Sequence, residues 1–343
     1  MAKQVLKTRF SARKSARTNV EGIWNLIERF IVPYRAAMFK NKNNEGNVDW
    51  SRRELFDSTA IKANTDLASH IHGAATNPSY RWSEFNFRDD ALKRDGEALE
   101  WIQECNQIIF DSIQASNFNT EINETYLDLT SFGDGTLVSQ PKETLTGKLD
   151  KIVYKAPPRD EIYFDFDTEG FPIAYYRRLY WTTQQIIDKF GDKVPTEIVE
   201  KNKRATGQLE KIEIIFCVYK REGINANPYV ITAAKNRPYG VKYFTYAGCE
   251  DLGEEDGDYE MPASNTRWGQ VSGSEFGFSP SMIAIWDVLT LNKLAELILL
   301  SGEKVIDPTL MTTRKGVWGD IDLSAGGVVV VTDLEKSMQA FES

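Results

Sequence analysis

The residue types that carry catalysis or bind metals are sparse in this chain. His70 and His72 are the only histidines, and they lie two positions apart on a predicted helix, so they point to different faces. Cys105, Cys217 and Cys249 are far apart, and no Cys-x-x-Cys occurs. This set does not fit a zinc site, and an odd cysteine count does not fit a disulfide scaffold. It favours a reducing, intracellular environment.

One acidic turn has part of the spacing of a calcium loop. Asp165, Asp167, Glu169 and Gly170 occupy suitable positions, but the twelfth position is Tyr176, where such a loop needs a bidentate glutamate. The same run separates two predicted strands. A hairpin turn is therefore the favoured interpretation, and calcium binding is the alternative.

Glycine motifs for nucleotide binding are incomplete. Gly133-x-Gly135 lacks the third glycine and precedes a predicted strand rather than a helix, so the dinucleotide fingerprint fails. Gly147-Lys148 has no glycine five positions earlier, so a phosphate loop fails too. No Gly-x-Ser-x-Gly elbow occurs. We therefore predict a protein that is not an enzyme and that uses neither a cofactor nor a metal.

Composition indicates a folded, soluble protein. The chain has 343 residues, 41% of them hydrophobic and 27% charged, with a formal charge of −9. Residues 1–17 lack the apolar core of a signal peptide. The longest apolar run, Met282–Leu300, contains Asp287, Asn292, Lys293 and Glu296, whereas a membrane span needs about 20 nearly unbroken apolar residues. We expect no membrane contact.

Helical patterns dominate the first third. Capping-box pairs at Thr18–Glu21 and Ser51–Glu54 predict two helix starts. A long helix is predicted over 92–116, and a shorter one is predicted to end at the Gly133-Asp134-Gly135 turn.

After this turn the pattern changes to short strands, and the fold class predicted is therefore α+β. Thr182 and Gln185 are predicted to cap a short helix, and Ser279-Pro280 is predicted to begin a helix that reaches about Asp307, roughly 38 Å long. A strand-rich tail with Val328–Val331 follows. The remaining predicted strands are 136–140, 149–155, 160–166, 172–181, 209–220, 229–234 and 241–247.

Two charge features stand out. The first is a basic N-terminal arm, which is predicted to contact nucleic acid or an acidic surface. The alternative is a disordered, solubilising terminus. The basic residues of the arm are Lys3, Lys7, Arg9, Arg13, Lys14 and Arg17. Residues 250–260 are predicted to be an acidic loop, which either docks a partner or is a solvated tip. The docking candidates in that loop are Glu254, Glu255, Asp256 and Asp258.

The helix after Ser279 has two arcs at about 100° per residue. Its apolar arc consists of Ile283, Val288, Leu291, Leu294, Ala295 and Ile298, with Asp287 among them in need of a partner. The polar arc, on the side away from the core, consists of Asn292, Lys293, Glu296, Glu303 and Lys304, with Leu289 and Leu300 among them. An ordinary amphipathic helix packed on its own domain is the alternative to an assembly role.

The order of several short motifs resembles one protein family, the portal or head-to-tail connector proteins of short-tailed bacteriophages. The likeness covers nearly the whole chain, and it rests on the shared order rather than on any single motif. In chain order the motifs are Trp24-x-x-Ile27-Glu28-Arg29, Asp57-Ser58-Thr59, Asn77-Pro78-x-x-x-Trp82, Ser131-Phe132-Gly133-Asp134-Gly135, Pro158-x-x-Glu161-Ile162-Tyr163, Tyr176-Arg177-Arg178, Thr182-x-x-Gln185, Phe190-Gly191, Glu275-x-Gly277-x-Ser279-Pro280 and Leu291-Asn292-x-Leu294.

The resemblance implies a closed homo-oligomeric ring, typically a dodecamer, at the portal vertex of the virion. Such a ring assembles in the host cytoplasm with the major capsid and scaffolding proteins. It forms the channel through which double-stranded DNA is packaged and ejected, and it docks the terminase and later the tail adaptor. The alternative function is a phage-encoded nucleic-acid-binding or processing protein of α+β fold without a recognisable catalytic motif.

The resemblance also implies a division of the chain into portal regions. The divisions are a basic arm at 1–18, a helical and β wing at 19–181, a first stem segment at 182–205, a small β-rich clip at 209–272, a long second stem helix at 279–306, and a strand-rich return to the wing at 307–343. Family members continue past this point with a kinked helix, a tunnel loop and a crown, so we expect a shortened or partly represented portal.

Site residues follow from this mapping. The polar arc of the second stem helix faces the channel or a neighbouring subunit, and the acidic loop contacts the adaptor or terminase. The net charge of −9 suits a conduit along which DNA slides without sticking.

Overall fold

The computed structural model describes residues 3–34, 55–143, 149–204, 206–224, 233–271, 273–307, 310–313 and 328–331. These residues form a mixed α+β fold with two antiparallel sheets and a two-stranded parallel pair. The chain divides into two compact units, one within Met1–Trp50 and Ala60–Ile285 and the other within Ser51–Thr59 and Trp286–Ser343. The α+β class predicted from the sequence is confirmed.

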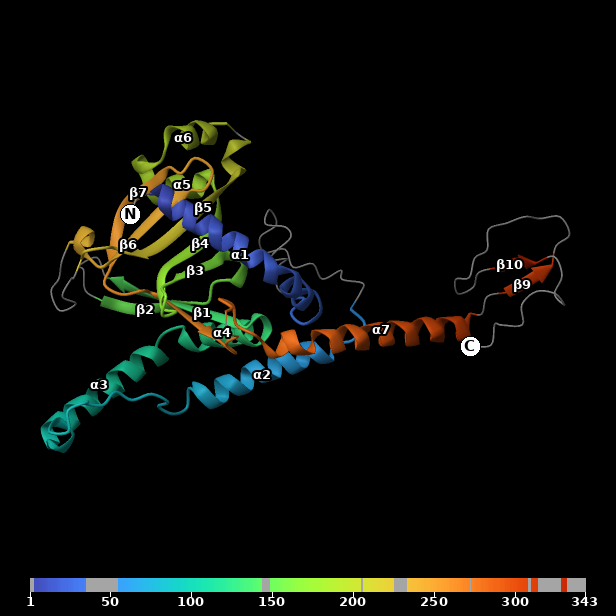
Figure 1. Cartoon of the computed structure of the whole chain (residues 1–343), viewed down its shortest axis with the longest axis horizontal. Coiled ribbons are helices and arrows are strands. Elements are labelled where there is room, and N and C mark those ends of the chain that lie inside the picture. Colours follow the sequence, from blue (N-terminus) through green and yellow to red (C-terminus); the bar gives the residue numbers. More distant parts are fainter. Residues whose placement is uncertain are drawn as a thin grey trace. The chain divides into compact units, whose positions relative to one another are not determined.

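A five-stranded antiparallel sheet is the centre of the first unit (Figure 1). Its strand order follows the sequence, so each strand pairs with the next. The strands are β3 (Ile162–Phe166), β4 (Pro172–Thr182), β5 (Lys211–Lys220), β6 (Tyr239–Thr245) and β7 (Asp251–Asp258). The first four match predicted strands. The strand predicted over 229–234 lies mostly outside the described residues, and its described end enters a short 3₁₀ turn, η5 (Ala234–Asn236).

The acidic run predicted as a loop is instead β7, at the edge of this sheet. It pairs with β6 from Tyr239 opposite Asp258 to Phe244 opposite Asp251. The prediction was wrong because the usual strand signal, hydrophobic alternation, is weak here. Leu252 is the one large apolar side chain of β7, and it is buried. Charged side chains are common on edge strands because they discourage pairing with other chains.

Helix α1 (Lys3–Phe30) lies across one face of the sheet (Figure 1). Leu6 and Phe10 are fully buried in a cluster with sheet residues that include Tyr176 and Phe244. The helix start predicted at Thr18 is therefore wrong, because the helix runs straight through that position. The basic arm is part of this helix from Lys3 onward, so it is not a disordered terminus.

The opposite face of the sheet is covered in two places. The second sheet, ordered β2-β1-β8, packs Val138 and Ala263 against strand residues such as Phe216. Two short helices pack Ile186 and Ile198 against another part of the same face. These elements are β1 (Asp134–Glu143), β2 (Leu149–Lys155), β8 (Ala263–Arg267), α5 (Thr183–Phe190) and α6 (Thr196–Asn202).

The alternation predicted for β5 is confirmed, because Ile215, Cys217 and Tyr219 join the cluster under α1, whereas Phe216 and Val218 join the other cluster. The capping box predicted for α5 is also present, since the Gln185 backbone N–H donates to the Thr182 hydroxyl at 3.3 Å.

Three further helices complete the first unit: α2 (Thr59–Ala75), α3 (Gly96–Gln114) and α4 (Phe118–Phe132). The start predicted at Ser51 lies outside the described residues. The helix itself begins at Thr59, where the Asp57 carboxylate accepts the Thr59 N–H at 3.2 Å. As predicted, α4 ends at Gly133 in the left-handed conformation. The acidic turn after β3 is a hairpin turn, in which Asp167 accepts the backbone N–H groups of Glu169 and Phe171.

The second unit contains most of helix α7 (Pro280–Ile306), which begins at Ser279-Pro280 as predicted. The tail forms a short parallel pair, β9 (Leu310–Thr313) with β10 (Val328–Val331). Among the described helices, none has the combination of length and apolarity that crossing a membrane requires. Strands expected in the wing (β3, β4) and in the clip (β5 to β7) belong to one sheet.

Candidate functional site

Several motifs that are far apart in the sequence meet where α7 begins. Gly133, with φ of +86°, closes α4 and lies directly against Gly277. A Cβ added to Gly133 would lie 2.5 Å from the Gly277 carbonyl oxygen, and one added to Gly277 would lie 2.0 Å from that of Gly133. Ser279 then caps α7, because its hydroxyl accepts the Met282 N–H at 3.0 Å and donates to the Ser131 carbonyl at 2.7 Å. We call this arrangement the α7 root.

A buried ion pair holds the α7 root together. The Asp134 carboxylate accepts from the Arg159 guanidinium at 3.0 Å, and both side chains are at least 95% buried. The other carboxylate oxygen accepts the Gly277 N–H at 3.0 Å. Trp24 of α1 donates its indole N–H to the Phe132 carbonyl at 3.0 Å, and its ring lies 4.9 Å from the Arg159 guanidinium carbon. Helix α1, the end of α4 and the segment before α7 are thus joined.

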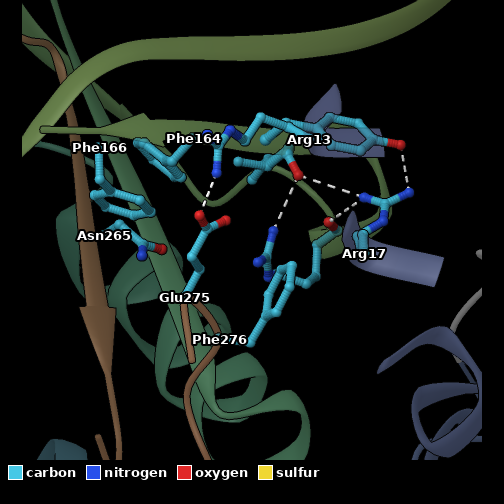
Figure 2. Close-up of a pocket in the computed structure, with 10 residues that line it drawn as sticks. Arg13, Arg17, Phe164, Phe166, Asn265, Glu275 and Phe276 are labelled. Atoms are coloured by element: carbon cyan, nitrogen blue, oxygen red, sulfur yellow. Dashed lines mark hydrogen bonds and ion pairs between the residues drawn. The ribbon is translucent and has the colours of Figure 1, made fainter. Parts of the chain in front are cut away.

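Two more arginines line a small cavity beside this pair (Figure 2). Arg13 pairs with Glu275, and Arg17 donates to the Asp160 carbonyl at 2.8 Å and to the Tyr163 hydroxyl. The cavity volume is about 20 Å³, which is enough for a water molecule but not for a substrate. The cavity beside the α7 root is therefore too small to be a substrate-binding pocket.

Sequence reasoning did not identify Asp134 and Arg159 as partners. The sequence feature that could have indicated this contact is the pair of glycine-containing turns at 133–135 and 275–280. Each turn has a glycine with no space for a side chain, as expected where two backbones approach closely.

We predict that Asp134→Ala destabilises the first unit by about 3–5 kcal/mol, because it leaves the buried Arg159 charge unpaired. Glu210→Ala is the matched control, since its ion pair with Lys201 at 3.2 Å is half exposed and contributes at most about 1 kcal/mol. Urea unfolding of both variants measures the difference. Equal unfolding midpoints for the two variants would contradict the role of this pair.

The apolar arc of α7 is exposed rather than packed inward. Leu291, Leu294 and Ile298 expose 51%, 50% and 70% of their surface, so the expected orientation of the helix is wrong. Asp287 is likewise exposed, so it needs no partner. We call the exposed row the α7 stripe; at 100° per residue it covers about 140° of the helix, and it consists of Trp286, Leu291, Leu294, Leu297, Ile298 and Val305.

Of the polar candidates, Asn292, Glu296 and Glu303 lie opposite the α7 stripe, whereas Lys293 and Lys304 lie within about 20° of Trp286, at the edge of the stripe. Asn292 is buried, and its side-chain oxygen accepts the backbone N–H groups of Phe56 and Asp57 at 2.8 and 3.2 Å. It therefore binds a segment of its own chain. Lys293 and Glu296 form an ion pair with each other at 2.7 Å, one helical turn apart. Glu303 and Lys304 are exposed.

The acidic candidates on β7 fall into two groups. Glu254, Asp256 and Asp258 line a groove on the sheet face away from α1, whereas Glu255 does not line it. Glu255 instead accepts from the Arg221 guanidinium at 2.6 Å and the Lys242 ammonium at 2.7 Å. Burial alone would raise the pKa of Glu255, but these hydrogen bonds lower it to about 2.

We expect Glu255→Gln to lower stability at neutral pH. A carboxyl whose pKa is lowered in the folded state stabilises that state above its ordinary pKa of 4.5, and this stabilisation is lost as the pH falls toward about 2. The variant should therefore lose less stability than the native chain between pH 4.5 and 2. Thermal unfolding across this range tests it, and parallel curves for the two proteins would refute the assignment.

The basic arm contacts acidic groups of its own chain. Lys3 pairs with Asp251 at 3.2 Å, and Arg9 and Arg13 both lie within 3.6 Å of Asp165. The remaining bases are occupied as well, since Lys7 donates to the Ala247 carbonyl, Lys14 lies over the Tyr246 ring, and Arg17 is buried and pairs with Glu21. Much of the arm's charge is thus used within the subunit.

A helix that leaves a row of large apolar side chains in water is typical of a protein that assembles. A family model described as bacteriophage head to tail connecting protein matches residues 3–342, and the chain belongs to this structural, non-enzymatic family. The probable portal protein of Bordetella phage BPP-1 is 22% identical over 293 residues, which cover 84% of this chain and 50% of that protein. The chain therefore spans about half the length of this curated relative. The family resemblance inferred from the order of motifs is confirmed.

Proposed function

We propose that this chain is a subunit of a closed ring at the portal vertex of a phage capsid. The observation that carries the proposal is the α7 stripe, because monomeric proteins rarely leave so large an apolar row exposed. A head-to-tail ring would cover the stripe on every subunit, since two different surfaces meet at each contact and the rotation closes.

The ring is proposed to have twelve subunits and to enclose the channel through which double-stranded DNA is packaged and ejected. Its partners would be the major capsid and scaffolding proteins during assembly, the terminase during packaging, and the tail adaptor afterwards. The net charge of −9 supports a conduit rather than a DNA-gripping protein, because phosphate neutralisation supplies most nonspecific affinity for DNA. The internal pairing of Lys3, Arg9 and Arg13 supports the same interpretation.

We propose a division of the chain that differs from the expected one. Because β5 to β7 continue the sheet of β3 and β4, residues 209–272 would belong to the wing. Helix α7 would then be the stem that leads out of the wing, and the segment with β9 and β10 would begin the clip. The α7 root, where the helix begins, would then stand at the boundary of the proposed wing and stem in the sequence.

The mass of the purified chain in solution tests this function. Mass photometry should find a particle of about twelve times the 39.0 kDa subunit mass. If only single, unassembled subunits were found at micromolar concentration, the result would contradict the ring.

A further inference from the structure

A groove of about 1020 Å³ lies in the first unit, on the sheet face away from α1. Its position is explained by the two sets of elements that pack on that face of the sheet. The second sheet covers the part around Val138, and α5 with α6 covers the part around Ile186, while Val241 and Tyr243 of β6 are only partly buried and line the groove. Strand residues, Phe190 of α5 and the segment between β7 and β8 (259–262) together form its lining.

The aromatic side chains of Phe190, Phe216 and Tyr243 line this groove. The Phe216 and Tyr243 rings lie 4.7 Å apart, and the Phe190 ring lies 5.3 Å from that of Tyr243. Gly253 has a φ of +76°, and a Cβ there would lie 2.8 Å from the Phe190 ring. This glycine lets β7 approach Phe190 closely.

Carboxylates form the rim. Asp256, Asp258 and Glu260 line the groove, and none of the three has an ion-pair partner within the described residues. Burial and the neighbouring Asp256 raise the pKa of Asp258, even though Arg237 opposes the change. An incoming cation would relieve this repulsion. Glu254 is already paired with Lys193 at 2.9 Å.

The aromatic group beside the groove already holds one cation of the chain. The Lys189 ammonium lies 4.4 Å from the centre of the Tyr243 ring and 4.5 Å from that of Trp181. The bases that line the groove itself are Lys142 and Arg237, and Arg237 stacks on Tyr259 and donates to the Gly257 carbonyl at 2.7 Å. Burial and the positive charges of Arg177 and Lys155 lower the pKa of Lys189, so it is the carboxylates lining the groove, rather than this aromatic group, that favour an incoming cation.

Two carbonyls near the end of β7 are already bonded. Arg221 donates to the Asp256 carbonyl at 2.9 Å, and Arg237 donates to the Gly257 carbonyl at 2.7 Å. The groove lies over the sheet face, so a ligand in it would bind mainly through side chains.

We propose that the groove binds an extended segment of another protein in which lysine or arginine residues alternate with apolar or aromatic ones. The basic side chains would bind Asp256, Asp258 and Glu260, and the apolar ones would pack on Phe190 and Tyr243. This inference extends the docking role in the proposed function. That the partner is a component of the phage particle rests on the proposed function. Charge complementarity of this kind mainly raises the rate of encounter.

The test is fluorescence anisotropy with a labelled twelve-residue peptide that alternates lysine with valine and phenylalanine. Asp256→Asn combined with Asp258→Asn should weaken its binding at least tenfold. The matched control is Glu97→Gln combined with Glu100→Gln, which removes the same charge from exposed positions of α3 and should leave binding unchanged. A probe with glutamate in place of lysine should not bind.

Equal losses in the groove and control variants would overturn the proposal, as would unchanged binding in the groove variant. If duplex DNA bound the native chain and this binding were lost in the groove variant, the proposal would also be overturned, because the ligand of the groove would then be a nucleic acid. Mass photometry of the same samples separates the two claims. A ring that does not bind the peptide refutes the groove alone, and a monomer that binds it refutes the ring alone.

Discussion

Replacing Leu294 and Ile298 together by serine should dissolve the ring into folded single subunits. Both side chains lie in the α7 stripe and expose at least half of their surface in the subunit. If a neighbouring copy covers the part of each side chain that is exposed in the subunit, each contributes about 1–2 kcal/mol to the contact. The double variant would then weaken every contact by about 2–4 kcal/mol, which is roughly thirtyfold to a thousandfold in its association constant.

The control is Lys293→Ala combined with Glu296→Ala, which replaces two polar residues of the same helix. Lys293 is exposed, Glu296 is partly exposed, and the two bond within their own helix, so their loss changes stability by at most about 0.5 kcal/mol. Size-exclusion chromatography with light scattering distinguishes the two variants, and circular dichroism shows that both are folded. Loss of the ring in the control but not in the stripe variant would mean that the polar arc forms the contact.

The second large effect is expected at the α7 root. Gly133→Ala should destabilise the first unit by at least about 3 kcal/mol, because the added Cβ needs a left-handed backbone and also meets the Gly277 carbonyl. Gly277→Ala should do the same, since its Cβ would meet the Gly133 carbonyl. Trp24, buried at the same place, reports the unfolding through its fluorescence.

Gly73→Ala is the matched control for this pair. Gly73 lies inside α2 with no atom within 4 Å of an added Cβ, so alanine should stabilise the chain by about 0.5–1 kcal/mol. If Gly133→Ala unfolded at the same urea concentration as the native chain, the two backbones would not pack as closely as described.

The sequence predicts some elements well because their signals are local. The Ser279-Pro280 start, the Thr182 capping box and the alternation of β5 each depend on a few neighbouring residues, and the structure has all three. The start predicted at Thr18 failed because a capping pair can also occur inside a helix, where tertiary packing of Leu6 and Phe10 extends the helix backward.

Long-range pairing explains the other misses. β7 is a strand because it pairs with β6, and the bases that bind Glu255 come from β6 and from the end of β5. The orientation of α7 depends on a segment near Phe56, more than 200 residues away, that binds Asn292. No local pattern encodes either contact. The helix periodicity located the apolar arc, but it could not show that this arc is exposed and that Asn292 is buried.

Negative-stain electron microscopy of the purified protein tests the central claim most directly. We predict closed rings with a central hole wide enough for duplex DNA, in which the α7 stripe of each subunit is covered by its neighbour. Fields of single particles of subunit size, without rings at any protein concentration tested, would contradict the proposed assembly.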